Sequence, residues 1–255
     1  MKSIAIIPAR MASSRFPGKP MAKIHGMPMI GHCYLRTRMC NDLLETYVAT
    51  CDQEIYDYVS SIGGKAVMTS DKHQRASDRA AEAMLKIEEE IKSKVDIVVM
   101  VQGDEPMVTP HMIRQAVAPL KEDPSIQVVN LMARMKTVGE FEDPNEVKVV
   151  VDPQSDAIYF SREPIPSRKK GAVDVPMLKQ VCIIPFRRDF LLKFNKLEPT
   201  PLEVIESVDM MRVIEHGYKV RMVLSREETL SVDTAGDLAR AEKAMEKDEL
   251  MKAYC

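Results

Sequence analysis

Short apolar runs alternate with amphipathic stretches in the first half of the chain, and this alternation constrains the fold more than any other feature. Residues 3–7, 46–50 and 95–101 are apolar runs of strand length, and the last is the most apolar. The stretches 53–62 and 77–92 have amphipathic patterns typical of helices. This order predicts an α/β fold, with a parallel sheet covered by helices on both faces. Ligands of such folds bind beyond the carboxyl ends of the strands.

The middle of the chain has a different pattern. Strand signals separated by short turns occur at 127–132, 146–151, 157–160 and 179–184. This spacing predicts an antiparallel insertion rather than further strand–helix–strand units. Residues 164–176 are expected to form a mobile loop. A further helix, a strand and a charged helix are expected at 201–216, 219–224 and 234–247.

The composition argues against several classes of protein. The chain of 255 residues has 36 Lys and Arg against 38 Asp and Glu, a net charge of −2, which is not typical of a general nucleic-acid binder but allows a local basic pocket. The five cysteines have no C-x-x-C spacing, so we expect reduced thiols. No apolar run reaches the ~18 residues of a membrane span, and the N-terminal run is too short for a signal peptide. We therefore expect a cytoplasmic protein.

The segment 8–20 that follows the first predicted strand is rich in turn-forming residues and carries three cations, Arg10, Arg15 and Lys19. Exposed backbone N–H groups and cations at the end of a strand suit a polyphosphate, although a solvated surface loop has the same composition. The segment is not a P-loop. The G-x-x-x-x-G spacing at 26–31 is followed by His32 and Cys33 rather than Lys and Ser or Thr. A G-x-G-x-x-G fingerprint is also absent from the sequence, which disfavours a dinucleotide enzyme.

Two carboxylates are candidate metal ligands. Asp104 lies in the sequence Gln-Gly-Asp-Glu-Pro directly after the most apolar run, where a carboxylate is well placed to hold Mg²⁺ against substrate phosphates. Gly103 beside it would let a ligand approach the backbone. An ordinary turn that caps the next helix explains the same residues. Asp233 precedes the last predicted helix, and taken alone it is better explained as an N-cap.

The segment 73–79 falls between a strand and a helix on the expected ligand edge. Asp78 and Arg79 near the helix start either cap and solvate that helix or bind a base or ribose. Ser77 is a further candidate for the helix cap. His73 has no Ser or Cys partner in a nucleophile context, so a hydrolytic triad is not expected.

Three acidic residues recur at a spacing of three in the predicted helix 201–216. If one helix carries Glu203, Glu206 and Asp209, the three form an acidic stripe. Such a stripe is ordinarily a solvated face. It can also present hydrogen-bond acceptors to the hydroxyl groups of a sugar.

Taken together, these segments resemble one family. The motifs IIPARMASSRFPGKP, VQGDEPM, PNEVKVVVD, IYFSREPIP, PLEVIES and SVDTAGDL occur in the order found in 3-deoxy-manno-octulosonate (KDO) cytidylyltransferases, also called CMP-KDO synthetases. The resemblance covers residues 3–245. It implies a Rossmann-like nucleotide-binding domain at 1–130 and 187–255, a smaller antiparallel dimerisation region at 131–186, and a homodimer. The reaction it implies is Mg²⁺-dependent transfer from CTP to a 2-keto sugar acid, with release of pyrophosphate, in lipopolysaccharide biosynthesis.

The resemblance also implies roles for individual residues. Arg10 and Lys19 would contact the CTP phosphates, Arg15 would lie between the nucleotide and the acid, and Asp104 and Asp233 would hold Mg²⁺. The residues expected to be catalytic are Arg10, Arg15, Lys19, Asp104 and Asp233. Those expected to bind the nucleotide are Pro8, Ala9, Arg10, Lys19, His73, Asp78, Arg79, Gln102 and Gly103. Those expected to bind the sugar acid are Arg15, Arg75, Arg162, Gln180, Glu203 and Glu206.

Two stretches depart from the family pattern, both on the acid side. Residues 73–79 read His-Gln-Arg-Ala-Ser-Asp-Arg where the family usually has His-Gln-Ser-Gly-Thr-Asp/Glu-Arg, so Arg75 is an added cation that can contact an anion. Residues 179–187 lack the His, the two Gly and the two Tyr that the family usually has there. We therefore expect cytidylyl transfer to KDO or a related sugar acid. A nucleotidyltransferase of the same fold with another acidic acceptor or nucleotide is the alternative, and a catalytically silent nucleotide-binding protein is a third hypothesis.

Overall fold

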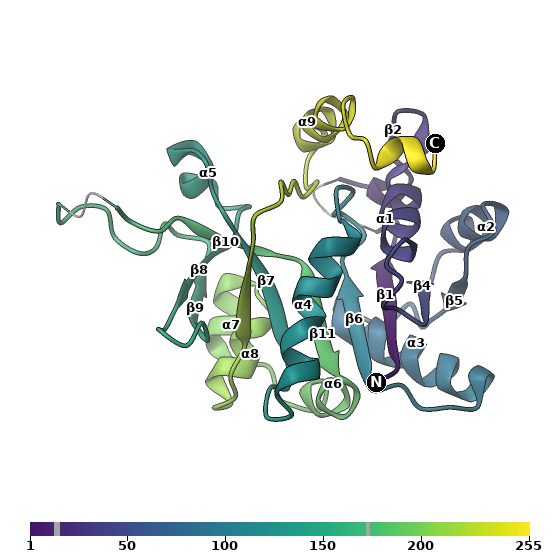
Figure 1. Cartoon of the computed structure of the whole chain (residues 1–255), viewed down its shortest axis with the longest axis horizontal. Helices are drawn as coiled ribbons and strands as arrows, with labels where there is room; N and C mark the ends of the chain where they lie inside the picture. Colours follow the sequence, from purple (N-terminus) through teal and green to yellow (C-terminus); the bar gives the residue numbers. More distant parts are fainter. Residues whose placement is uncertain (13–15, 172–173) are drawn as a thin grey trace.

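The computed structural model describes residues 1–12, 16–171 and 174–255. Its first sheet has the order β11-β6-β1-β4-β5 (Figure 1). Four neighbouring strands, from β6 to β5, run parallel, and β11 pairs antiparallel with β6. The strands are β1 (Ser3–Ala9), β4 (Glu45–Thr50), β5 (Ala66–Met68), β6 (Ile97–Val101) and β11 (Ile183–Arg187). The predicted α/β class with a mostly parallel sheet is confirmed.

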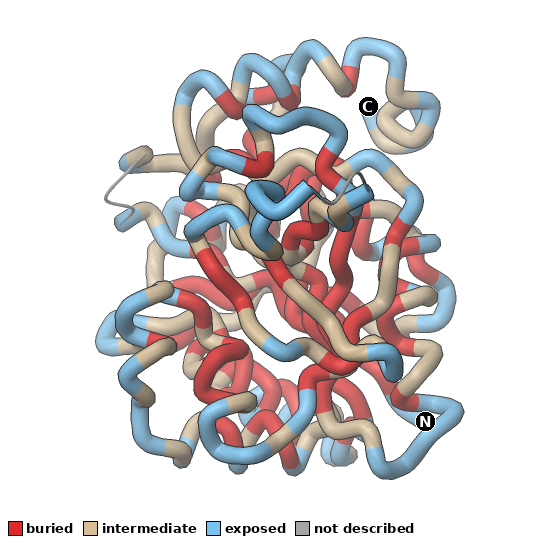
Figure 2. Tube along the Cα trace, turned by 90° about the vertical axis from the view of Figure 1, so that its left-hand side faces the viewer, coloured by how far each residue is buried: buried red, intermediate tan, exposed pale blue. Residues whose placement is uncertain are grey.

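Both faces of this sheet are covered, because apolar side chains alternate from one face of each strand to the other. Ala5 and Ile7 of β1 pack into one core with α1, α2 and α4, whereas Ile4 and Ile6 pack into a second core with α3 and α6. All five residues of β6 are buried. Figure 2 shows that the buried parts of the trace gather in the interior of the molecule. The covering helices are α1 (Met29–Arg38), α2 (Gln53–Ser61), α3 (Ala76–Ile91), α4 (Pro110–Glu122) and α6 (Arg188–Phe194).

The second sheet is mostly antiparallel and has the order β12-β7-β10-β8-β9. The pair β7 and β12 is parallel, and the other pairs are antiparallel. A single bridge between Val128 and Phe186 joins it to the first sheet. Its strands are β7 (Val129–Arg134), β8 (Lys148–Val151), β9 (Ala157–Ser161), β10 (Leu178–Val181) and β12 (Arg221–Ser225).

The two sheets exchange strands at places that the sequence pattern does not show. The single strand expected at 179–184 is two strands separated at Cys182, with β10 in the second sheet and β11 in the first. The strand β12, expected in the 187–255 portion of the nucleotide-binding domain, pairs with β7 in the second sheet. The second sheet is therefore not contained within residues 131–186.

The helix expected at 201–216 is also divided. It forms α7 (Pro201–Glu206) and α8 (Met210–Glu215), because Ser207 has a left-handed backbone conformation (φ 53°) that ends the first helix. The expectation of one continuous helix was wrong. The cap expected at Ser77 was wrong as well, because α3 begins at Ala76 and its N-cap residue is Arg75.

The remaining elements are short or terminal. No helix among the described residues is long and apolar enough to cross a membrane. All five cysteines are described, and each is a free thiol. The remaining elements are the 3-10 helices η1 (Lys19–Met21) and η2 (Met251–Ala253), the strands β2 (Lys23–Ile24) and β3 (Met27–Pro28), and the helices α5 (Val138–Glu142) and α9 (Ala235–Met245).

Candidate active site

Two adjoining cavities lie beyond the carboxyl ends of β1 and β6, where the sheet topology predicted a ligand. The first has a volume of about 610 Å³ and is lined mainly by residues from 8–12, 19–20, 73–79 and 102–104. The second, of about 450 Å³, lies toward the second sheet and shares Arg75, Gln102 and Asp104 with the first. The first cavity brings together the predicted residues Pro8, Ala9, Arg10, Lys19, His73, Arg79, Gln102, Gly103 and Asp104.

Local backbone geometry explains how the first loop reaches this edge. The loop begins directly after β1 and returns through Gly18, whose positive φ of 72° suits a residue without a side chain. The N–H of Gly18 donates to the carbonyl of Met11 (3.1 Å), which closes the loop and leads into η1 at Lys19. Arg10 is exposed at the cavity wall. Arg15, predicted to contact both substrates, lies outside the described residues.

At the centre of the site, Lys19 contacts two carboxylates. Its Nζ lies 2.7 Å from Oδ2 of Asp104 and 3.1 Å from Oδ1 of Asp233. Burial alone would lower the pKa of Lys19, but the two carboxylates outweigh it and raise that pKa above the usual value. The ammonium group is therefore charged at neutral pH.

The donor set at this point suits Mg²⁺. Asp104 and Asp233 are far apart in the sequence but converge on a single nitrogen, so both can reach one small cation. Mg²⁺ is typically bound by one or two carboxylates together with waters and substrate phosphates. Within the described residues, no group of three or more His, Cys, Asp or Glu side chains forms a complete protein cage for a metal. A carboxylate pair that shares its ion with a triphosphate needs no such cage.

The structure assigns the cap of α9 to Thr234 rather than to Asp233. The Thr234 hydroxyl accepts from the N–H of Asp237 (3.2 Å), and Asp237 accepts in return from the N–H of Thr234 (2.8 Å). This reciprocal pair is a capping box. The explanation of Asp233 as an N-cap was wrong, and its carboxylate faces Lys19 instead.

In the first cavity, Arg79 is a buried cation at the wall. Its Nη1 donates to Thr69 Oγ1 and to the carbonyl of Ser70, whereas its buried Nη2 has no hydrogen-bond partner among the described residues. An unpartnered buried donor is costly, so this nitrogen is a good candidate to bind a ligand. His73 contacts Glu82 of α3. Asp78 lies in the first turn of α3 and does not line either cavity.

Gly103 is needed for packing at the end of β6. A Cβ atom there would lie 3.1 Å from the carbonyl oxygen of Pro8 and 3.3 Å from Ile30. The glycine therefore allows the close approach of the neighbouring protein backbone, and it also lines the first cavity, where the predicted approach of a ligand stays a prediction. Glu105, which directly follows Asp104, was not predicted as a site residue. Burial, with a further contribution from Asp104, raises the pKa of Glu105 to about 8.

Three of the residues predicted to bind the acid, Arg75, Arg162 and Gln180, line the second cavity and already have protein partners. Gln180 donates to Asn130 Oδ1 (2.5 Å). Arg162 donates to the carbonyl oxygens of Glu206 (2.7 Å) and Pro144 (2.8 Å). Ser207, which the sequence did not indicate, lines both cavities because the helix break places it there.

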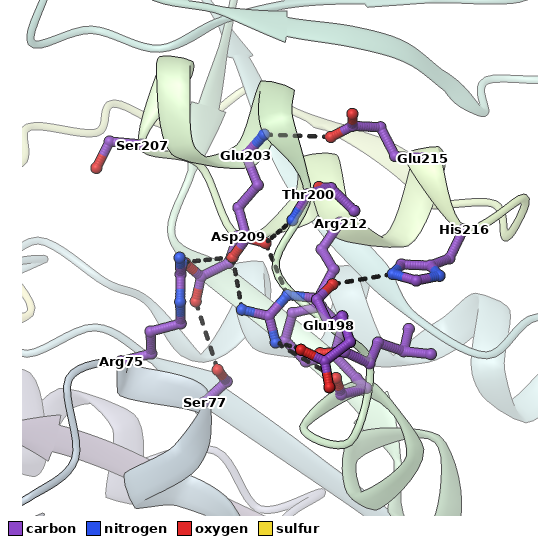
Figure 3. A network of polar contacts seen from close by, with 12 residues as sticks. Arg75, Ser77, Glu198, Thr200, Glu203, Ser207, Asp209, Arg212, Glu215 and His216 are labelled. Atoms are coloured by element: carbon purple, nitrogen blue, oxygen red, sulfur yellow. Dashed lines mark hydrogen bonds and ion pairs between the residues drawn. The ribbon is translucent and has the colours of Figure 1, made fainter.

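The acidic stripe does not exist in the structure. Glu203 is 0% exposed, and its two carboxylate oxygens accept from Nε and Nη2 of Arg212, each at 2.7 Å (Figure 3). Glu206 accepts from the Tyr159 hydroxyl (3.0 Å) and the Arg162 N–H (2.8 Å). Neither carboxylate lines either of the two cavities, and the prediction that they bind the sugar stays untested. The break at Ser207 turns these side chains toward protein partners.

The fold and site define a nucleotidyltransferase, and the comparisons identify its class. The family profile described as "Cytidylyltransferase" matches residues 4–228, so the protein is a cytidylyltransferase. More specifically, the chain belongs to the 3-deoxy-manno-octulosonate cytidylyltransferase family. It is 43% identical to the member from Geobacter metallireducens, over 97% of this chain and 98% of that protein, and 43% identical to the member from Syntrophotalea carbinolica, over 95% and 98%.

Solved structures agree with this assignment. CMP:2-keto-3-deoxy-manno-octonic acid synthetase, solved in complex with CTP, is 36% identical and superposes with a TM-score of 0.87 over 96% of this chain and 98% of that one. A cytidylyltransferase from Leptospira borgpetersenii has a TM-score of 0.65 at 16% identity, covering 96% and 87%, and shows a shared fold alone. The predicted family and enzyme class are confirmed.

Proposed function

We propose that this chain transfers CMP from CTP to KDO or a closely related 2-keto-3-deoxy sugar acid and releases pyrophosphate. The observation that carries the proposal is the convergence of Lys19, Asp104 and Asp233 at the shared wall of two cavities. The names of the similar proteins support CTP and KDO as the pair of substrates. The product would feed lipopolysaccharide synthesis, and a reaction that uses CTP is expected in the cytoplasm.

The first cavity would bind the nucleotide. Arg10 and Lys19 would contact the phosphates of CTP, because both side chains line this cavity next to the loop after β1. Gln102 and the unpartnered Nη2 of Arg79 would hydrogen-bond the nucleoside. These residues fix the position of the α-phosphorus relative to the second cavity, and positioning supplies a large share of the rate in phosphoryl transfer.

The second cavity would hold the sugar acid. The anomeric hydroxyl of the acid attacks the α-phosphorus, gives its proton to the solvent and forms the new P–O bond, while the bond to the β-phosphate breaks and pyrophosphate leaves. Asp104 and Asp233 would hold Mg²⁺, which supplies charge neutralisation on the phosphate oxygens when bound. Lys19 keeps the two carboxylates together and adds a fixed positive charge beside them. No covalent intermediate is required.

The test is pyrophosphate release by the purified protein with Mg²⁺, measured for four nucleoside triphosphates against a panel of sugar acids that includes KDO. We expect release with CTP and KDO. Release with CTP and a different acid would retain the chemistry and change the acceptor. Release with another nucleotide would support the alternative of a related nucleotidyltransferase. If CTP binds and no acid in the panel gives release, the proposed reaction is refuted for those acids.

We also propose that the protein is a homodimer and that the second sheet contributes to the contact. The antiparallel strands β8, β9 and β10 lie at one side of the molecule, beyond the elements that form the nucleotide cavity (Figure 1). Sedimentation equilibrium of the purified protein distinguishes a dimer from a 28.8 kDa monomer.

A further inference from the structure

Arg75 lies at the wall shared by the two cavities, and two carboxylates hold its guanidinium. Its Nη1 lies 2.6 Å from Oε1 of Glu203 and also donates to Oδ1 of Asp209 (Figure 3). Arg212 already pairs with Glu203 through two nitrogens. Two guanidinium groups therefore balance two carboxylates, and Arg75 is the partner of Asp209.

The opposite edge of the Arg75 guanidinium is not used by the protein. Among the described residues, neither Nε nor Nη2 of Arg75 has a hydrogen-bond partner, and the side chain is 26% exposed. Nε and Nη2 form the edge of the planar guanidinium that donates two parallel hydrogen bonds to a carboxylate. Because Nη1 is held by Glu203 and Asp209, much of the entropy cost of ordering this long side chain is already met in the free protein.

The second cavity offers no comparable cation within residues 1–12, 16–171 and 174–255. Arg162 is the other guanidinium on its wall, and all of its nitrogens donate to carbonyl oxygens of Glu206, Pro144 and Ser207. The phosphates, in contrast, have Arg10 and Lys19 in the first cavity. Arg75 is also the N-cap residue of the 16-residue helix α3, whose N-terminus adds a partial positive charge.

We propose that Arg75 binds the carboxylate of the acceptor sugar acid through Nε and Nη2, and that Glu203 and Asp209 are positioning residues that hold its guanidinium. This inference rests on the proposed function, because it requires an acidic acceptor. It identifies a residue that determines specificity for acids over neutral sugars. Oδ2 of Asp209 lies 3.4 Å from the Ser77 hydroxyl, so Asp209 would also fix Arg75 against the start of α3.

The test compares steady-state kinetics of the wild type and Arg75→Gln with CTP, Mg²⁺ and KDO. We expect the KM for KDO to rise about 10- to 100-fold, as for the loss of a charged hydrogen-bonding partner, while the KM for CTP changes by less than about threefold. Arg221→Gln is the matched control, because Arg221 is similarly exposed (29%) and pairs with the buried Asp156 far from both cavities. We expect this control to leave both KM values unchanged.

A second acceptor separates direct binding from a structural role. The carboxamide of KDO lacks the negative charge, so the wild type should prefer KDO over it in kcat/KM, and Arg75→Gln should lose most of that preference. Equal losses for both acceptors, a raised KM for CTP instead, or an unchanged KM for KDO would each overturn the inference. If Arg75→Gln does not fold, Arg75→Lys is measured in the same way, because it keeps the charge and removes the bidentate edge. Failure of the proposed function is separate, since the wild type itself would then release no pyrophosphate with CTP and KDO.

Discussion

Replacing Glu203 with Gln tests whether this residue acts through stability, as the structure indicates, or through substrate binding. Its carboxylate is 0% exposed and accepts from Arg212 at 2.7 Å twice, from Arg75 at 2.6 Å and from the N–H of Thr200 at 3.2 Å. The substitution keeps the shape of the side chain and removes the charge. Arg212, 4% exposed, then lacks its compensating carboxylate.

The expected cost follows from these contacts. Removing one partner of a buried ion pair typically destabilises a protein by about 3–5 kcal/mol, because the remaining charge stays desolvated. For a chain of this length, each kcal/mol corresponds to a decrease of roughly 2–4 °C in the midpoint of thermal unfolding. We therefore expect Glu203→Gln to lower that midpoint by about 6–20 °C.

The assay is urea unfolding followed by circular dichroism, with thermal unfolding as a second measurement. Glu249→Gln is the control, because Glu249 pairs with Lys252 on the surface and exposed pairs contribute about 0–1 kcal/mol. A loss in Glu203→Gln no larger than in this control would refute the argument that Glu203 neutralises Arg212. A stable variant with a raised KM for the sugar acid would show that Glu203 affects acid binding, directly or by positioning Arg75, rather than stability.

Three further predictions concern the metal site, a helix cap and a titrating carboxylate. Asp104→Asn should reduce kcat by about 10²- to 10³-fold through lost electrostatic stabilisation, while the circular dichroism spectrum is retained. In an Mg²⁺ titration of activity, this variant should need a higher Mg²⁺ concentration for half-maximal activity than the wild type. Thr234→Ala should lower the free energy of unfolding by about 1 kcal/mol in urea, because α9 loses its cap; an unchanged stability would contradict the capping box. Burial opposes ionisation of Glu82, but Lys86, the Ser70 N–H and His73 lower its pKa to about 2. Because the folded pKa lies below the unfolded value, Glu82 stabilises the fold at neutral pH, and this contribution is lost as the pH falls from about 4.5 toward 2. The stability difference between wild type and Glu82→Gln should therefore shrink over that range, and a constant difference would contradict the assignment.

Much of the nucleotide side could be predicted because it depends on local order along the chain. The apolar run that became β6 identified a central strand, and parallel strands place their carboxyl ends at one edge of the sheet. Gln102 and Asp104 come just after the end of β6, and Lys19 lies in the segment that follows β1, so their grouping was accessible from spacing and motif. The acid side was less predictable. Glu203 and Asp209 were assigned to one helix, since nothing in the local pattern signalled a left-handed residue at Ser207.

The sequence by itself determined the α/β class, the family and the edge of the sheet at which the site lies, because apolar periodicity and contiguous motifs are local properties of the chain. Tertiary structure decided which side chains pair at that edge. Lys19 meets Asp233 across 214 positions, and Arg75 meets Asp209 across 134. Such contacts depend on how distant segments pack, and a buried cation pairs with whichever carboxylate the packing places beside it. For that reason the carboxylate of Asp233 faces Lys19 rather than capping a helix, and Arg75 is held at Nη1 by the carboxylates of Glu203 and Asp209.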